Sequence, residues 1–248
     1  MHFPLWSRKY FRSLFSKINN SRYQNWKKER MLKFYAQFIG PGDLCFDVGA
    51  NIGYYSSTFL TLGTRVIAIE PVSENITRLN QRFKDEKNLV VVQTAVSDET
   101  RVGTIHKGRS LDLSTLEKSF VNFNEQQSNE PWTETETVSL TRLDELIKVH
   151  GLPHYCKIDV EGHEKEVLSG LSSIIPIISF EFLFPFKEKA VACILQIGKL
   201  SPNAVYNYSL FEFFELENEE WLDAKSFISY VSDLPKSHWT GDIFCKLL

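Results

Sequence analysis

Five acidic residues stand at or near the ends of apolar runs that have the length of β-strands. They are Asp47, Glu70, Asp159, Glu161 and Glu181. Ligands of doubly wound sheets bind beyond the carboxyl ends of the strands, so acids that recur there indicate a common site. Such carboxylates accept hydrogen bonds from hydroxyl groups, pair with cations or take up protons. Strand ends also face solvent, where acids are common, so ordinary surface groups are the alternative interpretation.

The first of these runs, residues 44–48, ends in a glycine turn. Gly49 and Gly53 stand four positions apart, and a segment compatible with a helix, residues 54–62, follows at once. Glycines allow a ligand to approach the backbone because they have no Cβ. The next run ends in Glu70, 17 residues beyond Gly53. An acid at the end of the second strand is well placed to bind both hydroxyls of a ribose, so the pattern predicts a nucleoside-containing cofactor.

The residues of the turn favour one cofactor over others. Asn51 and Tyr54 stand at the second and third glycine positions of the dinucleotide fingerprint G-x-G-x-x-G, and the sequence contains no P-loop motif. Asp47 would repel phosphate groups and attract an ammonium or a sulfonium. S-adenosylmethionine has both of these cations and a ribose but no phosphate, so it fits the turn better than NAD or ATP.

Strand-like and helix-like segments alternate along the chain, as in a doubly wound α/β domain. Ile76, Leu79 and Phe83 form the apolar stripe of a helix expected at residues 73–83. The apolar runs at residues 205–216 and 240–248 are too close to each other for another β-α repeat with a long crossover. The terminal strand is therefore expected to pair antiparallel. The predicted strands are residues 44–48, 65–70, 89–93, 155–160 and 174–182, followed by the apolar runs 205–216 and 240–248.

Two segments between the third and fourth predicted strands bear on ligand binding. The loop at residues 94–98 should lie beside an adenine, so Thr94, Ala95 and Asp98 are candidates to contact it, although an ordinary strand exit explains each residue equally well. Residues 107–134 are polar and weakly patterned, which is unusual for so long a segment in a compact domain. They are predicted to form a substrate-side lid, or alternatively an insertion without such a role.

The composition of the 248-residue chain suits one α/β domain, residues 40–248, after a basic helical segment at residues 1–39. The four cysteines form no C-x-x-C motif and are expected to be buried free thiols in a reducing compartment. No apolar stretch reaches the 18 residues of a membrane span, and the first residues lack the apolar core of a signal peptide. A cytoplasmic protein is therefore expected.

The first 33 residues contain nine Lys or Arg and a single acid, Glu29, whereas the whole chain has a net charge of −3. Residues 3–18 have the pattern of a basic amphipathic helix. Such a helix suits peripheral contact with a membrane through residues 3–33, or contact with an anionic partner. The slightly favoured interpretation is instead that its aromatic side packs on the domain. A second helix is expected at residues 26–38.

Four segments in this order and spacing resemble the FkbM family of S-adenosylmethionine-dependent methyltransferases. They are residues 46–55 (Phe-Asp-Val-Gly-Ala-Asn-Ile-Gly-Tyr-Tyr), 69–71 (Ile-Glu-Pro), 95–98 (Ala-Val-Ser-Asp) and 157–164 (Lys-Ile-Asp-Val-Glu-Gly-His-Glu). The resemblance covers roughly residues 40–185. It implies a mostly parallel, seven-stranded, Rossmann-like methyltransferase sheet that ends in an antiparallel hairpin. It also implies methylation of a hydroxyl on a sugar, glycolipid or natural product.

The same resemblance implies roles for the turn, with Asp47, Gly49 and Gly53 at the methionine end of the cofactor and Glu70 at the ribose. An alcohol acceptor must also lose its proton, so Asp159, Glu161, His163 and Glu181 are the candidates for the catalytic base. Asp159 is preferred because it ends the fourth strand, whereas His163 is expected at the surface or in contact with substrate. The full set predicted to bind cofactor is Asp47, Gly49, Ala50, Asn51, Gly53, Tyr54, Glu70, Pro71, Thr94, Ala95, Asp98 and Asp159.

Different functions are also compatible with these residues. Asp159, Glu161 and His163 could bind a metal, but their spacing matches no specific ligand pattern, and no metal is predicted. A nucleic-acid methyltransferase is less favoured and nucleic acid is not expected as a partner, because acids outnumber bases outside residues 1–33 and no Asn/Asp-Pro-Pro-Tyr motif occurs. A non-catalytic protein of the same fold that binds the cofactor or docks on a membrane is also possible, and a nicotinamide oxidoreductase is a weaker hypothesis. The expected partner is a small hydroxyl acceptor that contains carbohydrate.

Overall fold

Five parallel strands form the middle of the main sheet in the computed structural model, which describes residues 20–108, 113–128, 131–183, 186–210, 213–234 and 240–248. These strands are β1 (Leu44–Val48), β2 (Arg65–Glu70), β3 (Leu89–Gln93), β8 (Tyr155–Ile158) and β9 (Ile177–Leu183). Continuous apolar runs suit strands that are covered on both faces. The five predicted parallel strands are confirmed, with the fifth beginning three residues later than expected.

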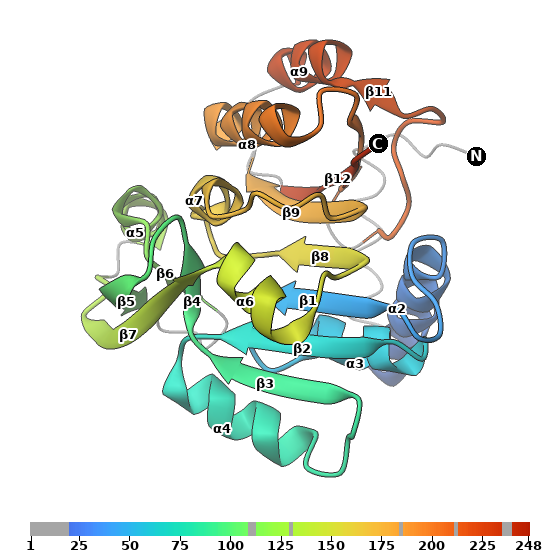
Figure 1. The fold of residues 1–248 in the computed structure, drawn as a ribbon. Helices are drawn as coiled ribbons and strands as arrows, with labels where there is room; N and C mark the ends of the chain where they lie inside the picture. The colour runs from blue at the N-terminus through green and yellow to red at the C-terminus, as the bar shows by residue number, and fades with distance from the viewer. Residues whose placement is uncertain (1–19, 109–112, 129–130, 184–185, 211–212, 235–239) are drawn as a thin grey trace.

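The other side of this sheet is antiparallel. The order of the eight strands is β11-β10-β12-β9-β8-β1-β2-β3 (Figure 1). The last strand, β12 (Thr240–Lys246), lies between β9 and β10 (Val205–Leu210) and runs antiparallel to both. The expected antiparallel pairing of the terminal strand is confirmed, whereas the sheet has eight described strands rather than seven. The described sheet is mixed, and the two-residue strand β11 (Leu222–Asp223) and helix α9 (Ala224–Asp233) separate β10 from β12 along the chain.

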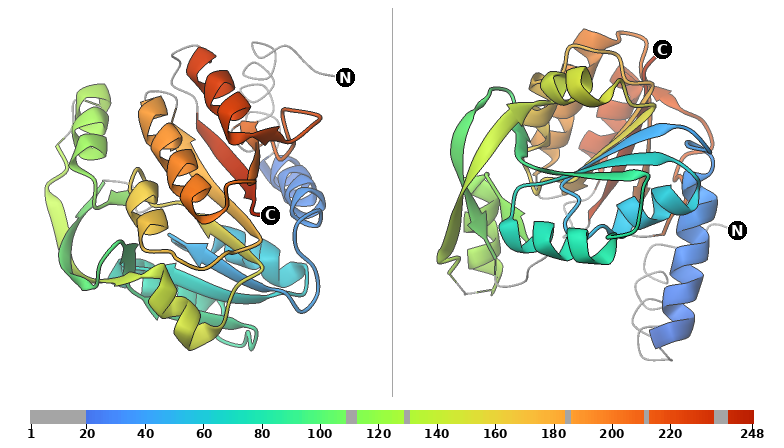
Figure 2. Two further views of the ribbon diagram at one scale, coloured as in Figure 1. Left: turned by 45° about the horizontal axis from the view of Figure 1, so that its top comes forward. Right: turned by 60° about the horizontal axis from the view of Figure 1, so that its bottom comes forward.

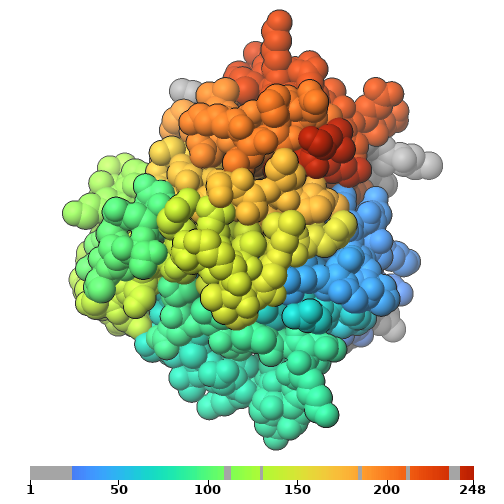
Figure 3. All heavy atoms as spheres, viewed as in Figure 1, coloured from blue at the N-terminus to red at the C-terminus, as the bar shows by residue number. Residues whose placement is uncertain are grey.

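Alternate residues of the central strands enter two hydrophobic cores, because successive side chains of a strand point to opposite faces. On one face, Phe46 and Cys156 pack with α6 (Leu143–His150), α7 (Glu164–Ser169), α8 (Lys187–Leu200) and α9. On the other, Cys45 and Tyr155 pack with α2 (Asn20–Tyr35) and α3 (Tyr54–Thr61). Helix α4 (Ser73–Arg82) buries Leu79 against Ala50 and Ala68. In the face seen in Figures 1 and 3, α6 covers the middle of the molecule.

Helix α2 belongs to the second of these cores. It buries Met31, Phe34 and Tyr35, and the helix expected at residues 26–38 is confirmed with earlier bounds, Asn20–Tyr35. Residues 3–18 lie outside the described residues, so the amphipathic helix expected there stays a prediction, as does the domain boundary near residue 40. Within the described part of the chain no helix is both long and apolar enough to cross a membrane. All four cysteines are buried and unpaired, as expected.

A second sheet stands beyond the carboxyl ends of the central strands (Figure 1). Its strand order is β4-β7-β5-β6, with β4 (Ala95–Ser97), β5 (Arg101–Lys107), β6 (Ser114–Thr115) and β7 (Glu134–Arg142). Helix α5 (Lys118–Ser128) follows β6 and lies beside this sheet (Figure 2). One expectation is thereby corrected, because residues 94–98 contain a strand rather than a plain exit loop. The described parts of residues 107–134 contain β6 and α5, and the role of this segment as a substrate-side lid or an insertion stays a prediction.

Candidate active site

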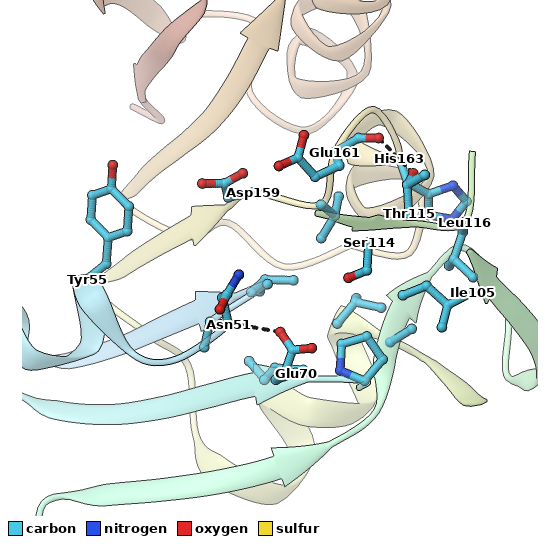
Figure 4. A pocket seen from close by; sticks show the side chains of 18 of the residues that line it. Asn51, Tyr55, Glu70, Ile105, Ser114, Thr115, Leu116, Asp159, Glu161 and His163 are labelled. Atoms are coloured by element: carbon cyan, nitrogen blue, oxygen red, sulfur yellow. Dashed lines mark hydrogen bonds between the residues drawn. The ribbon is translucent and has the colours of Figure 1, made fainter. Parts of the chain in front are cut away.

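A cavity of about 360 Å³ lies where β1, β2 and β8 end against the second sheet. This volume is in the range of small-molecule sites. Asp159 and Glu161 face it from one side and Glu70 from the other, while Ile105 and Leu116 close the end next to the second sheet (Figure 4). The cavity therefore has acidic groups along its length and an apolar end.

The two glycines of the first turn are required by the protein's own packing. Gly49 has a φ of 82°, and a Cβ on it would overlap the backbone carbonyl of Asp159. Gly53 has a φ of 80°, and a Cβ on it would overlap the side chains of Phe83 and Leu79. The expectation that Gly49 makes room for a ligand stays a prediction, whereas Gly53 does not line the cavity. Gly49 lines the cavity while keeping β1 close to the loop after β8, and Gly53 allows α3 to start beside α4.

Glu70 is held in place by three donors of the protein. Its side chain accepts hydrogen bonds from the backbone N–H of Asn51 at 2.9 Å and of Val72 at 2.9 Å, and from Nδ2 of Asn75 at 3.2 Å. Burial raises the pKa of Glu70, and the three hydrogen bonds oppose that rise. A carboxylate offers about four acceptor positions. With these three donors bound, an acceptor position remains on the oxygen that binds Asn51, so a ribose would be held chiefly by that oxygen.

Asp47 lies beneath the turn. Its side chain is 1% exposed and accepts a hydrogen bond of 2.6 Å from Oγ of Ser56. Burial raises its pKa, opposed by Ser56 and by the positive charge of Lys157. Contrary to expectation, Asp47 is not among the residues that line the cavity. Asp47 therefore acts indirectly. It fixes the turn through Ser56 and adds negative electrostatic potential beneath the cavity.

Nine of the twelve residues predicted to bind cofactor line the cavity. They are Gly49, Ala50, Asn51, Tyr54, Glu70, Pro71, Thr94, Ala95 and Asp159. Asp47, Gly53 and Asp98 do not line it. Asp98 is exposed, and its carboxylate accepts a hydrogen bond from Oγ of Ser97, so the expectation that it touches an adenine is not supported by its position. The binding roles of the nine stay predictions.

Three of the four predicted catalytic residues form one acidic cluster. Carboxylate oxygens of Asp159, Glu161 and Glu181 all lie within 4.8 Å of one another. Burial and the neighbouring negative charges raise the pKa of Glu161 and of Glu181 well above the usual range. Asp159 and Glu161 line the cavity, whereas Glu181 lies behind them next to Glu164. The cluster is a place where a cation, organic or metallic, would be stabilised.

A buried lysine orients this cluster, although its importance was not predicted from the sequence. Nζ of Lys157 lies 2.7 Å from Asp159 and 3.5 Å from Asp242, and 4.1 Å from the centre of the Tyr55 ring. The Lys157 side chain is 1% exposed. Burial lowers its pKa, but Asp159 and Asp242 outweigh that effect, so the net shift is upward and the ammonium stays charged. The sequence did contain a signal for it, because a lysine within an apolar strand needs buried acidic partners.

The loop after β8 has a costly backbone conformation. Glu161 has a φ of 53° and Gly162 a φ of 96°. A left-handed conformation at a residue such as Glu161 is unfavourable unless the surroundings impose it. The Thr115 hydroxyl donates to the carbonyl of Glu161 at 2.7 Å, and Nζ of Lys189 donates to the carbonyl of Gly162 at 3.0 Å. Strand β6 of the second sheet thus helps to aim Glu161, through a threonine that no sequence signal had marked.

His163 lies inside the protein, so of its two expected positions the surface one is wrong, and contact with substrate stays a prediction. It is 8% exposed and lines the cavity. Its Nε2 lies 3.0 Å from Oγ of Ser97, and burial lowers its pKa. Its possible metal partners are Glu117 and Glu166, not Asp159 and Glu161, which differs from the grouping considered from the sequence. His163 therefore favours its neutral form at the second-sheet side of the cavity.

Solved structures with similar chain traces share very little sequence with this chain. A precorrin-6y C5,15-methyltransferase from Geobacter metallireducens is 9% identical, with 88% of this chain and 86% of that chain covered and a TM-score of 0.48. A putative RNA methyltransferase from Pyrococcus horikoshii is 12% identical, with 90% and 82% covered and a TM-score of 0.46.

Sequence comparison gives a more specific result. The hexuronic acid methyltransferase AglP of Haloferax volcanii is 30% identical over 162 residues, which are 64% of each chain and thus less than two thirds of that relative. The family model of the methyltransferase FkbM domain matches residues 47–219, which include Glu70 and the acidic cluster. The chain therefore belongs to the FkbM methyltransferase family.

Proposed function

We propose that this protein is an S-adenosylmethionine-dependent O-methyltransferase that methylates a hydroxyl group of a sugar or glycolipid. The observation that carries the proposal is the cluster of Asp159, Glu161 and Glu181 beside a cavity that Glu70 faces from the opposite side. Bound S-adenosylmethionine would supply an activated methyl group on a sulfonium, a cation that such a cluster stabilises.

The lining residues fit the parts of this cofactor. Ile105 and Leu116 offer apolar contact for the adenine, and the open acceptor position of Glu70 suits a ribose hydroxyl. Asp159, fixed by Lys157, suits the cationic methionine end. This arrangement would also hold the acceptor hydroxyl close to the methyl group, and positioning of this kind is worth about 7–11 kcal/mol in well-oriented reactions.

Glu161 is the preferred base in this proposal, instead of Asp159. Asp159 binds Lys157 through an oxygen at 2.7 Å, whereas Glu161 faces the cavity and has a pKa raised by burial and by its acidic neighbours. A higher pKa makes a carboxylate a stronger proton acceptor once it is ionised. Thr115 and the strained backbone of residue 161 aim that carboxylate.

The relative named for hexuronic acid supports a carbohydrate acceptor. Its name leaves open whether a hydroxyl or a carboxylate of the sugar is methylated. The acidic cluster favours a hydroxyl, because a carboxylate acceptor would meet repulsion from Asp159 and Glu161. This argument concerns the reacting group only, and a uronic acid could still present a hydroxyl there.

The test uses S-adenosylmethionine with a labelled methyl group and a panel of neutral sugars, uronic acids and glycolipid precursors. We expect label that survives mild alkali, as an ether does, and a loss of transfer of at least about 100-fold in Glu161→Gln. Glu99→Gln, at an exposed position, is the matched control and should be unchanged. Alkali-labile label would assign carboxyl methylation instead. Transfer only to RNA would indicate a nucleic-acid methyltransferase, and cofactor binding without transfer would indicate a non-catalytic binding protein.

A further inference from the structure

Helices α2 and α3 lie side by side in matching register. Oγ1 of Thr58 donates to Sδ of Met31 at 3.2 Å, and Met31 is 1% exposed. One helical turn earlier on each helix, Nζ of Lys27 lies 4.7 Å from the centre of the Tyr54 ring. Residues four apart share a helix face, so the contact that anchors Met31 also directs Lys27 toward the start of α3.

That position places a cation at the cavity. Lys27 and Tyr54 both line it, and among the described lining residues Lys27 is the only Lys or Arg. Tyr54 and Tyr55 are the first residues of α3, whose N-terminal end has a partial positive charge. Both features favour an anion at this end of the cavity. The acids Glu70, Asp159 and Glu161 make the remainder of the wall negative.

We propose that Lys27 binds the carboxylate of the amino-acid part of the cofactor, opposite the acids that bind its cationic groups. This inference rests on the proposed function. It assigns a binding role to a helix that precedes residues 47–219, the part matched by the family model. Helix α2 would then complete the cofactor site as well as the hydrophobic core.

The affinities for two nucleosides distinguish a binding role of Lys27 from a structural one. S-adenosylhomocysteine contains the amino-acid carboxylate, whereas methylthioadenosine lacks it. For Lys27→Ala we expect calorimetry to give a dissociation constant for S-adenosylhomocysteine that is about two- to fivefold higher, the range of a partly exposed ion pair. The dissociation constant for methylthioadenosine should stay the same. Lys27→Arg should restore most of the affinity, and Lys28→Ala, at an exposed neighbouring position, should match the wild type.

Equal affinity of wild type and Lys27→Ala for S-adenosylhomocysteine would overturn the inference, as would an equal loss for both nucleosides. A variant with unchanged affinity for S-adenosylhomocysteine but a raised KM for uronic acid acceptors would overturn it too, and would assign Lys27 to an acceptor carboxylate. Failure of the wild type to bind either nucleoside would instead contradict the proposed function itself.

Discussion

The turn after β1 and the loop after β8 meet at the cavity, and both contain left-handed residues, yet they are stabilised differently. In the turn, Asn51 has a φ of 51° and its N–H is bound by Glu70, which lies at the end of the adjacent strand. In the loop, Glu161 has a φ of 53° and is held by Thr115, whose strand belongs to the second sheet. The turn is thus held by the adjacent strand of its own sheet, whereas the loop also needs a strand of the second sheet that is far away in sequence.

The two regions also differ in how their charges are compensated. Glu70 accepts three hydrogen bonds from nearby donors and so is ready to orient a ligand. Glu161 and Glu181 lie against other acids, with pKa values raised by burial and repulsion. The turn with Glu70 is therefore a preorganised binding region. The acidic cluster is a region whose negative charge is balanced fully only when a cation binds.

The largest expected effect concerns the point where the two regions touch. Gly49→Ala places a Cβ against the carbonyl of Asp159 at a φ of 82°, so both the turn and the loop must shift. We expect the free energy of unfolding to fall by about 3 kcal/mol or more, measured by chemical denaturation. Gly198→Ala, in helix α8 with no atom within 4 Å of the added methyl, should instead be neutral or stabilising by up to about 1 kcal/mol. Equal behaviour of the two variants would refute the contact.

The next effect tests the buried cation of the loop. Lys157→Met leaves Asp159 and Asp242 without their shared ammonium, and we expect a loss of about 2–3 kcal/mol in the free energy of unfolding, a value reduced because the Asp159 side chain is 28% exposed. Lys148→Met is the control, since its ion pair with Glu145 has the same 2.7 Å distance but a 68% exposed lysine, and should cost less than about 0.5 kcal/mol. Adding Asp159→Asn to Lys157→Met should recover part of the loss.

A smaller effect, on binding, tests the turn. Glu70→Ala should weaken the binding of S-adenosylhomocysteine by about 1.5–3 kcal/mol, because a charged acceptor of the ribose is lost and the N–H of Asn51 loses its partner. Calorimetry is the measurement. Glu74→Gln, on the exposed side of α4, should bind like the wild type. Unchanged affinity in Glu70→Ala would remove Glu70 from the ribose role.

The pH dependence of stability distinguishes the two regions further. Burial raises the pKa of Glu164, beneath the loop, from 4.5 to about 7. Well below pH 4.5 Glu164 is protonated in both the folded and the unfolded state. As the pH rises from about 4.5 to about 7, the unfolded chain loses this proton while the folded protein keeps it, so the contribution of Glu164 to stability is lost. Glu164→Gln keeps an acceptor for the N–H of Gly162 but cannot ionise. Its free energy of unfolding should therefore fall less steeply between about pH 4.5 and 7, by about 1–2 kcal/mol, and parallel profiles would contradict this.

The smallest effect tests the link from the second sheet to the loop. Thr115→Val keeps the side-chain shape but removes the donor to the carbonyl of Glu161. We expect a loss of about 1 kcal/mol in the free energy of unfolding and a lower kcat, with unchanged affinity for S-adenosylhomocysteine. Thr61→Val, where the hydroxyl is exposed, should leave kcat unchanged. Weaker cofactor binding without a change in kcat would show that Thr115 acts on the turn instead.

The same contrast explains what could be predicted from the sequence. The central strands and Glu70 were predictable because apolar runs, glycines and the spacing along one β-α-β unit are local signals. The link between Lys157 and Asp242 was not, since it depends on β12 inserting beside β9. The assembly of the second sheet was not predicted, because β6 has only two residues and α5 has no strong apolar stripe. Glu161 could be placed near the site, but its burial and the hydrogen bond from Thr115 that holds its strained backbone depend on segments distant in sequence.

The most direct test of the central claim is a crystal structure of the protein with S-adenosylhomocysteine. We predict a ribose hydroxyl within hydrogen-bonding distance of the Glu70 oxygen that binds Asn51, the adenine against Ile105 and Leu116, and the sulfur facing Asp159 and Glu161. A nucleoside bound elsewhere, or one whose sulfur points away from these acids, would contradict the assignment of this cavity as the cofactor site.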